Sequence, residues 1–126
     1  MAKKTDNLGK TGESIACEYL TNKGYVILRQ NWRVKGGEID VVARAKDKTL
    51  VFVEVKTFMG PLASAQELVP EDNITAAKLV KFKRACEMFV AKNQESIDER
   101  RGWRIDVVAI EVLPGKQPAI RHYENV

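Results

Sequence analysis

The sequence predicts an α/β protein in which a central mixed sheet is flanked by helices. Three observations support this prediction. The 126 residues suffice for one domain with its own core, the hydrophobic fraction of 44% is that of an ordinary globular protein, and helical and strand-like patterns alternate along the chain. Their order is a helix, three strands in a meander, a second helix, and one or two further strands. We therefore expect a single domain spanning residues 1–126.

The first helix is predicted over residues 6–23, with Gly24 placed where helices commonly end. Residues 1–6 before it are expected to form a flexible arm. Glu13 lies on or beside the apolar stripe of this helix, which is an unusual place for a carboxylate. A negative charge in the first turns can complement the helix dipole, and a functional role is the alternative.

Three strands follow the first helix. Residues 25–33 are rich in β-branched and aromatic side chains, and a Gly-Gly pair then supplies a turn. Residues 37–42 and 50–56 have the same strand-like composition and are separated by a short charged turn. These segments predict the three-stranded meander.

Charged side chains interrupt the second and third of these strands. Glu54 and Lys56 share one face of their strand, because side chains alternate with a period of two. If the turn is centred on Asp47, Asp40 lies directly across from Glu54. Two acids and a lysine are therefore expected to converge.

The regular pattern stops after Lys56. Residues 57–73 contain one glycine and two prolines and show little periodicity, which is typical of a lid, a binding loop or a disordered segment. We expect a mobile loop here, with a short helix over residues 63–68.

A second amphipathic helix is predicted over residues 74–93, since its apolar residues recur at helical spacing. Cationic side chains crowd its first half. They form either a solvated helix face or a surface that follows a phosphate backbone. These candidate nucleic-acid-binding residues are Lys78, Lys81, Lys83 and Arg84. Residues 103–110 then predict a strand, and residues 118–123 predict a short edge strand.

Composition and single residues exclude several classes of protein. The net charge of +4 favours an anionic partner only weakly. No apolar run is long enough for a transmembrane helix and the N-terminus lacks a signal-peptide core, so we expect a cytoplasmic protein without membrane contact.

Cys17 and Cys86 lie far apart and are expected to be reduced and packed. A single histidine, His122, is expected at the surface and rules out sites that need several imidazoles.

Asp40, Glu54 and Lys56 together suit one kind of chemistry. Two converging carboxylates repel each other unless one is protonated or a cation lies between them. Mg²⁺ or Mn²⁺ resolves this conflict, because these ions prefer oxygen ligands, and a lysine beside them can stabilise developing negative charge. Hydrolysis of a phosphodiester fits this set. The alternative is an exposed ion pair between Glu54 and Lys56, with Asp40 accepting hydrogen bonds from a turn.

The same residues resemble the YraN-like family of small bacterial proteins, which is similar to Holliday junction resolvases of the PD-(D/E)xK superfamily. The resemblance is dense from about residue 9 to residue 57 and thinner beyond. Ile39 stands where that superfamily has its proline, and Thr57-Phe58 follows the motif lysine where the family often has a basic residue. The motifs that carry it are Gly12-Glu13 with Ala16 and Tyr19-Leu20, Gly24-Tyr25-Val26-Ile27-Leu28, Asn31-Trp32-Arg33, Gly37-Glu38-Ile39-Asp40 and Val51-Phe52-Val53-Glu54-Val55-Lys56.

The resemblance implies a restriction endonuclease-like αβββαβ core and a metal-dependent endonuclease acting on branched or structured DNA. It implies that Asp40 and Glu54 bind Mg²⁺ or Mn²⁺, with the Val55 carbonyl as a further ligand. Lys56 would be the catalytic lysine, and Glu13 the helix acid that assists in positioning metal or water.

Two other functions remain open at this point. One is a nucleic-acid-binding module that uses the same fold without catalysis and binds through its basic helix. The other is a protein-interaction subunit that uses the C-terminal edge strand. Branched DNA has two-fold geometry, which a homodimer would match.

Overall fold

The computed structural model describes residues 4–59 and 76–126. Its elements follow the expected order of helix, three strands, helix and two strands. Within the described ranges, neither long helix is apolar enough to cross a lipid bilayer. The elements are α1 (Lys4–Asn22), β1 (Val26–Val34), β2 (Gly37–Arg44), β3 (Leu50–Met59), α2 (Ala76–Lys92), the short 3-10 helix η3 (Gln94–Ser96), β4 (Trp103–Val112) and β5 (Ala119–Tyr123).

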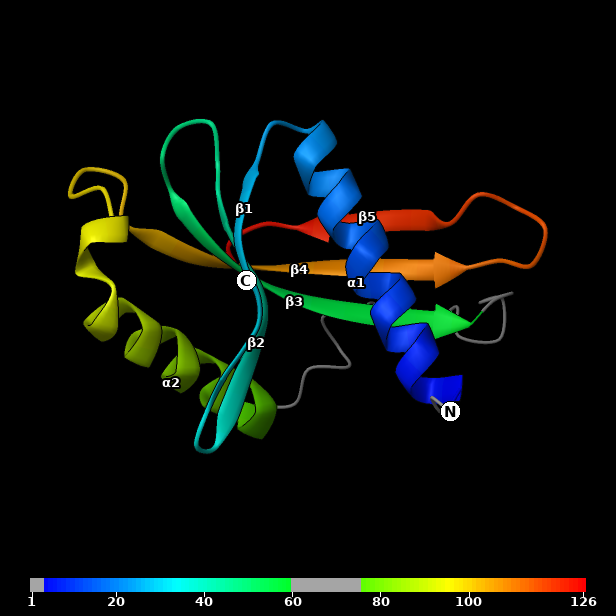
Figure 1. The fold of residues 1–126 in the computed structure, drawn as a ribbon, viewed down its shortest axis with the longest axis horizontal. Coiled ribbons are helices and arrows are strands. Elements are labelled where there is room, and N and C mark those ends of the chain that lie inside the picture. Colours follow the sequence, from blue (N-terminus) through cyan, green and yellow to red (C-terminus); the bar gives the residue numbers. More distant parts are fainter. Residues whose placement is uncertain (1–3, 60–75) are drawn as a thin grey trace.

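The strands form one mixed sheet in the order β1-β2-β3-β4-β5. Neighbouring strands are antiparallel except β3 and β4, which are parallel. A parallel pair needs a long crossover, and α2 lies in the chain between these two strands. Figure 1 shows the β1–β2 hairpin running steeply across the direction of β3, β4 and β5, so the sheet is strongly twisted. The predicted α/β fold with a central mixed sheet is confirmed, and the element order is that of the αβββαβ core.

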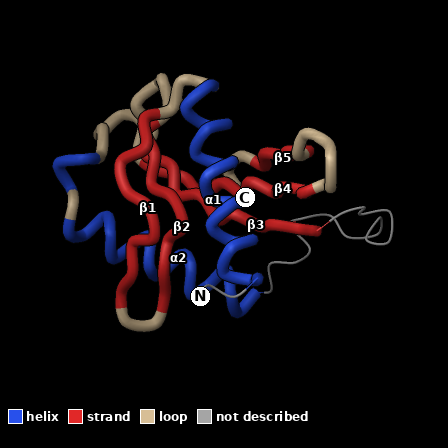
Figure 2. Tube along the Cα trace, turned by 45° about the vertical axis from the view of Figure 1, so that its right-hand side comes forward, coloured by secondary structure: helices blue, strands red, loops and turns tan. Residues whose placement is uncertain are grey.

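Each face of the sheet carries one helix and one apolar cluster. Side chains alternate along β3, so its even-numbered residues Leu50 and Phe52 pack towards α2 while Val51 and Val53 pack towards α1. The trace in Figure 2 shows the same arrangement of helices and strands turned by 45°. Because both faces are covered, the middle strands are apolar on both sides. The largest members of the α2 cluster are Phe52, Phe82, Phe89, Ile39, Leu50 and Ile105, and those of the α1 cluster are Leu20, Val41, Val51, Val53, Val108 and Ile110.

Some boundaries differ from those expected. The sequence predicts a flexible arm that includes residues 4–6, whereas these residues are helical, since α1 begins at Lys4. The mobile loop was expected from residue 57, yet β3 continues to Met59 because residues 50–59 all pair with β4. The remainder of that loop, including the short helix expected over 63–68, lies outside the described residues.

Two glycines allow the helices to approach the sheet closely. A Cβ atom on Gly12 of α1 would lie 2.0 Å from the Oγ1 atom of Thr57 in β3. A Cβ atom on Gly37, at the start of β2, would lie 3.2 Å from the carbonyl oxygen of Lys81 and 3.3 Å from the Cβ atom of Ala85 in α2. These contacts hold α1 against the end of β3 and bring the first turns of α2 next to the β1–β2 turn.

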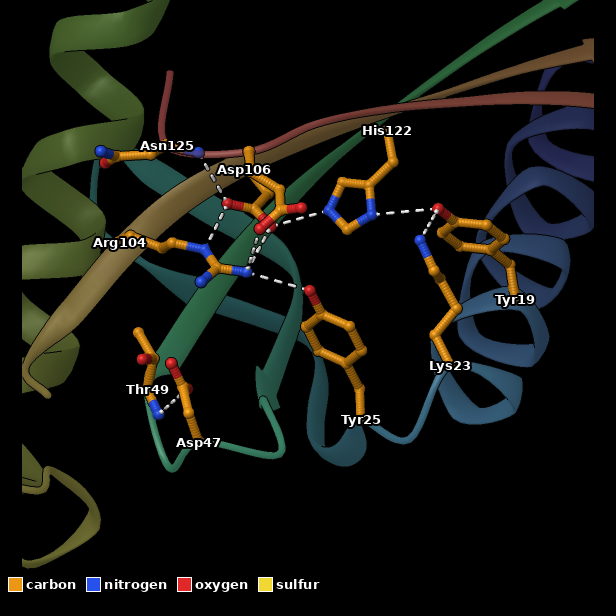
Figure 3. Close-up of polar contacts among 10 residues, drawn as sticks. Tyr19, Lys23, Tyr25, Asp47, Thr49, Arg104, Asp106, His122 and Asn125 are labelled. Carbon is orange, nitrogen blue, oxygen red and sulfur yellow. Dashed lines mark hydrogen bonds and ion pairs between the residues drawn. The ribbon is translucent and has the colours of Figure 1, made fainter.

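A buried polar network joins β4, β5 and the C-terminal residues (Figure 3). The Asp106 side chain is fully buried and accepts hydrogen bonds from Arg104 Nε at 2.9 Å, His122 Nε2 at 2.7 Å and the Asn125 backbone N–H at 3.0 Å. Burial by itself would raise the pKa of Asp106, but the hydrogen bonds from His122, Arg104 and Asn125 hold this pKa below its usual value. Asp106 is therefore an ionised, fully paired core residue.

His122 is not at the surface, so that expectation is wrong. Its side chain is 5% exposed, because α1 covers this part of β5. The hydroxyl of Tyr19 in α1 is hydrogen-bonded to His122 Nδ1 at 3.1 Å, and Lys23 Nζ donates to the same hydroxyl at 3.1 Å. The network thus fastens the C-terminal half of α1 to the sheet. Cys17 and Cys86 are both free thiols, as expected.

Candidate active site

The strands β2 and β3 separate at the predicted site. Their last paired residues are Val41 and Val53, and the pairing is centred on Asp47, which confirms the expected register. Asp40 and Glu54 occupy the next position in this register, but they do not continue the ladder. An opening between β2 and β3 therefore begins at the two carboxylates.

The side chain of Asp40 takes the place of a ladder hydrogen bond. Its Oδ2 atom accepts a hydrogen bond from the Val55 backbone N–H at 2.8 Å. The N–H and C=O groups of one residue in an extended strand point to the same edge, so the Val55 carbonyl also faces β2 beyond the last pair. The family resemblance implies this carbonyl as a backbone metal ligand.

Glu54 and Lys56 share one face of β3, as the period of two predicts. Lys56 Nζ lies 3.3 Å from Glu54 Oε1, and their side chains are 19% and 25% exposed, respectively. The pair is therefore partly screened from water but still accessible. The same cavity is lined by Asp40, Glu54 and Lys56, so the structure brings these three predicted residues together.

Both carboxylates hold their protons more tightly than ordinary acids. Burial, followed by the charge of Glu54, raises the pKa of Asp40 from 3.8 to about 7, although the Val55 hydrogen bond opposes this. Burial also raises the pKa of Glu54, while the neighbouring Lys56 partly counteracts it. Two partly buried acids that are costly to ionise together form a site whose electrostatic conflict a cation would relieve.

The cavity has a volume of about 290 Å³ and lies between the β1–β2 turn, β3, β4 and the beginning of α2. Lys78 and Lys81 line it, because the close approach at Gly37 holds α2 beside β2. Lys83 and Arg84 are exposed and are not among the residues that line the cavity. The structure therefore divides the four predicted cations into two at the site and two outside it.

Glu38 is a third acid at this cavity that the sequence reasoning did not assign to the site. It pairs with Arg33 at 3.0 Å, and its charge contributes to the raised pKa values of Asp40 and Glu54. The signals for it were its spacing of two residues from Asp40 and its place in the Gly37-Glu38-Ile39-Asp40 motif. Neither signal distinguishes a site residue from a surface acid, and Glu38 also has a surface partner in Arg33.

Glu13 approaches from the helix on the other face of the sheet. It is half-buried, and its negative charge contributes to the raised pKa of Asp40 and of Cys17. The Gly12–Thr57 contact places this turn of α1 against β3. Glu13 is not among the residues that line the cavity, so it acts on Asp40 through its charge rather than by sharing the cavity wall.

The donor set limits the kind of metal site that fits here. Among the described residues, no three His, Cys, Asp or Glu side chains are grouped so as to hold an ion by themselves. Two carboxylates and a backbone carbonyl nevertheless fit Mg²⁺ or Mn²⁺, which commonly take one or two protein carboxylates and complete their coordination with water and substrate phosphate. The hydrogen bond from the Val55 N–H involves only one of the two carboxylate oxygens of Asp40, namely Oδ2.

The matching family model and the similar proteins all belong to the same family. The model of "Uncharacterised protein family UPF0102" matches residues 12–110. A UPF0102 protein of Geobacter metallireducens is 39% identical over 99% of this chain and 95% of its own length. One from Roseiflexus castenholzii is 37% identical over 97% of this chain and 94% of its own, and one from Mycobacterium tuberculosis is 36% identical over 94% and 91%. The chain belongs to the UPF0102 family, the YraN-like family that its motifs resemble.

Proposed function

We propose that this protein is a metal-dependent endonuclease that hydrolyses phosphodiester bonds in branched or structured DNA. The observation that carries the proposal is the pair Asp40 and Glu54, held where β2 and β3 separate, with Lys56 beside Glu54 at 3.3 Å. Such a constellation has a cost for folding, since both acids are hard to ionise in the metal-free protein. Because the arrangement does not stabilise the fold, we explain it by the binding of a cation and an anionic substrate.

Each residue has a defined role in this proposal. Asp40, Glu54 and the Val55 carbonyl hold Mg²⁺ or Mn²⁺, which when bound supplies charge neutralisation at the phosphate and lowers the pKa of water. Lys56 donates to a phosphate oxygen and stabilises negative charge that develops during hydrolysis. Glu13 adds negative potential at Asp40 and so favours cation binding.

The lysines of α2 supply the attraction for DNA. Lys78 and Lys81 line the same cavity as the carboxylates, so they lie close enough to contact phosphates next to the reacting one. Lys83 and Arg84 are exposed on the same helix and extend the positive surface away from the cavity. Lysines contribute a salt-dependent affinity that carries no sequence preference.

A cleavage assay tests the proposal. Purified protein is incubated with end-labelled four-way junctions, flaps and linear duplexes in Mg²⁺ or Mn²⁺, alongside Asp40→Asn, Glu54→Gln and Lys56→Gln. We expect cleavage of the structured substrates and a loss of roughly 10²-fold or more in each variant. The exposed acid Glu99 provides the matched control, Glu99→Gln, which should cleave like the wild type.

Two outcomes would contradict the proposal. Equal cleavage by the wild type and the Asp40→Asn and Glu54→Gln variants would show that the activity comes from elsewhere. Salt-sensitive DNA binding without cleavage, lost in Lys78→Gln and Lys81→Gln but retained in the acid variants, would instead support the catalytically inactive binding module. The acids favour the enzyme, because carboxylates facing a phosphate backbone weaken simple binding.

Two further expectations belong to the same proposal. The two-fold geometry of branched DNA favours a homodimer as the active species, which light scattering with and without a four-way junction tests. A nuclease of this kind acts where the chromosome lies, in the cytoplasm.

A further inference from the structure

The cavity beside the carboxylates has a second, apolar half. Asp40, Glu54 and Lys56 line one part of it, and apolar side chains from α2 and β4 line the rest. Phe82 and Ile105 are each 7% exposed, so this part is a recess in the core rather than a loose surface. The residues that form the apolar recess are Leu79, Phe82, Ile105 and Val107.

Binding to the DNA backbone alone does not require an apolar recess. Contacts to a duplex backbone are made to phosphates and sugars by polar and cationic groups. The apolar faces of the bases are stacked inside the helix and cannot enter a protein cavity unless a nucleotide leaves the stack. An apolar wall directly beside a phosphate-binding site therefore suits a nucleotide whose base is unstacked.

The spacing along α2 supports the same conclusion. Lys78 and Lys81 are three residues apart, and so are Leu79 and Phe82, so the two pairs form adjoining rows on one helix face. Both rows line the cavity. One row offers cationic partners for phosphates, and the next offers an aliphatic and an aromatic surface for a base.

We propose that the apolar recess holds a single unstacked nucleobase of the strand whose phosphate lies at Asp40 and Glu54. The inference rests on the proposed function for the position of that phosphate and extends it to the substrate. The preferred DNA then has an unpaired nucleotide next to the scissile phosphate, as at a flap, a gap or a frayed branch point. The volume of about 290 Å³ is near the lower limit of ligand sites and suits one nucleotide rather than a duplex segment. Recognition by apolar contact favours tolerance of base identity.

A pair of neighbouring substitutions isolates the recess. Leu79→Gln places a polar group in it, whereas Val80→Gln makes the same kind of change at the next residue, which is 56% exposed on α2 and does not line the cavity. Both variants are compared with the wild type in thermal unfolding, so that a folding defect is recognised. Neither residue is among the proposed metal ligands or the catalytic lysine.

The measurement is binding to flap DNA in which each nucleotide near the junction is replaced in turn by an abasic site, with Ca²⁺ in place of Mg²⁺ or Mn²⁺ as the oxygen-bound cation. We expect one abasic position to weaken binding by the wild type and Val80→Gln by about tenfold. In Leu79→Gln the intact flap should bind about as weakly as the abasic one. Fully paired duplex should bind all three proteins alike.

The outcomes separate this inference from the proposed function. An abasic effect that is equal in the wild type and Leu79→Gln, or absent at every position, overturns the recess as a base site even if the protein cleaves DNA. An abasic effect that Leu79→Gln removes supports the base site even if no cleavage is found in Mg²⁺ or Mn²⁺. In that case only the catalytic proposal fails.

Discussion

Replacing Asp40 by asparagine should stabilise the metal-free protein at alkaline pH. The pKa of Asp40 rises from 3.8 to about 7, and each pH unit of such a difference corresponds to about 1.4 kcal/mol. Ionising Asp40 in the folded state therefore costs at most about 4 kcal/mol. Asparagine carries no charge, and its carbonyl oxygen can still accept the hydrogen bond from Val55. The variant should avoid the cost and keep the contact.

The sign of the pH dependence follows from the direction of the pKa change. Because the folded state binds the proton more tightly than the unfolded state, stability is full below about pH 4 and falls as pH rises towards 7. The wild type should therefore lose stability over this range relative to Asp40→Asn. The stabilising effect of the substitution should be largest near pH 8 and should largely vanish near pH 4.

Urea unfolding in EDTA at pH 4.5 and pH 8 measures this difference, with Glu99→Gln as a control that changes an exposed acid. Adding Mg²⁺ at pH 8 should stabilise the wild type and leave Asp40→Asn unchanged, since only the wild type keeps both carboxylates. The reasoning is refuted if Asp40→Asn is no more stable than the wild type at pH 8, or if its advantage is the same at both pH values.

Three other perturbations test the buried Asp106 network, the packing of α1 against β3, and the proposed contact of α2 with DNA. Asp106→Asn should destabilise the protein by about 3 kcal/mol in urea unfolding, because it breaks a buried ion pair. The low pKa of Asp106 means that its contribution is present above about pH 4 and lost as pH falls further, so the deficit should shrink in acid. Gly12→Ala should cost about 1–3 kcal/mol by overpacking against Thr57, and Thr57→Ala in the same chain should recover part of the loss of thermal stability. Lys81→Gln should reduce the slope of log affinity against log salt for DNA by about one, measured by fluorescence anisotropy, whereas no change in slope would remove Lys81 from the interface.

Local patterns predicted much of the fold. The order of helices and strands, the Gly24 helix end and the register centred on Asp47 all follow from short-range periodicity and turn chemistry. The shared face of Glu54 and Lys56 follows from the period of two. Boundaries were less well predicted. α1 starts earlier and β3 ends later than expected, because pairing with β4 extends a strand whose own residues read as a loop.

The sequence by itself determined which side chains share a strand face and which residues oppose one another, since both depend on local backbone geometry. Only the tertiary structure decided that β2 and β3 part at Asp40, that Lys78 and Lys81 line the same cavity as the carboxylates, and that His122 is buried against Asp106. These features depend on contacts between segments far apart in the chain. Burial raises the pKa of Asp40, and the packing of α1 and β5 gives Asp106 its hydrogen-bond partners. Both are properties of the packed molecule, so the local sequence pattern does not predict them.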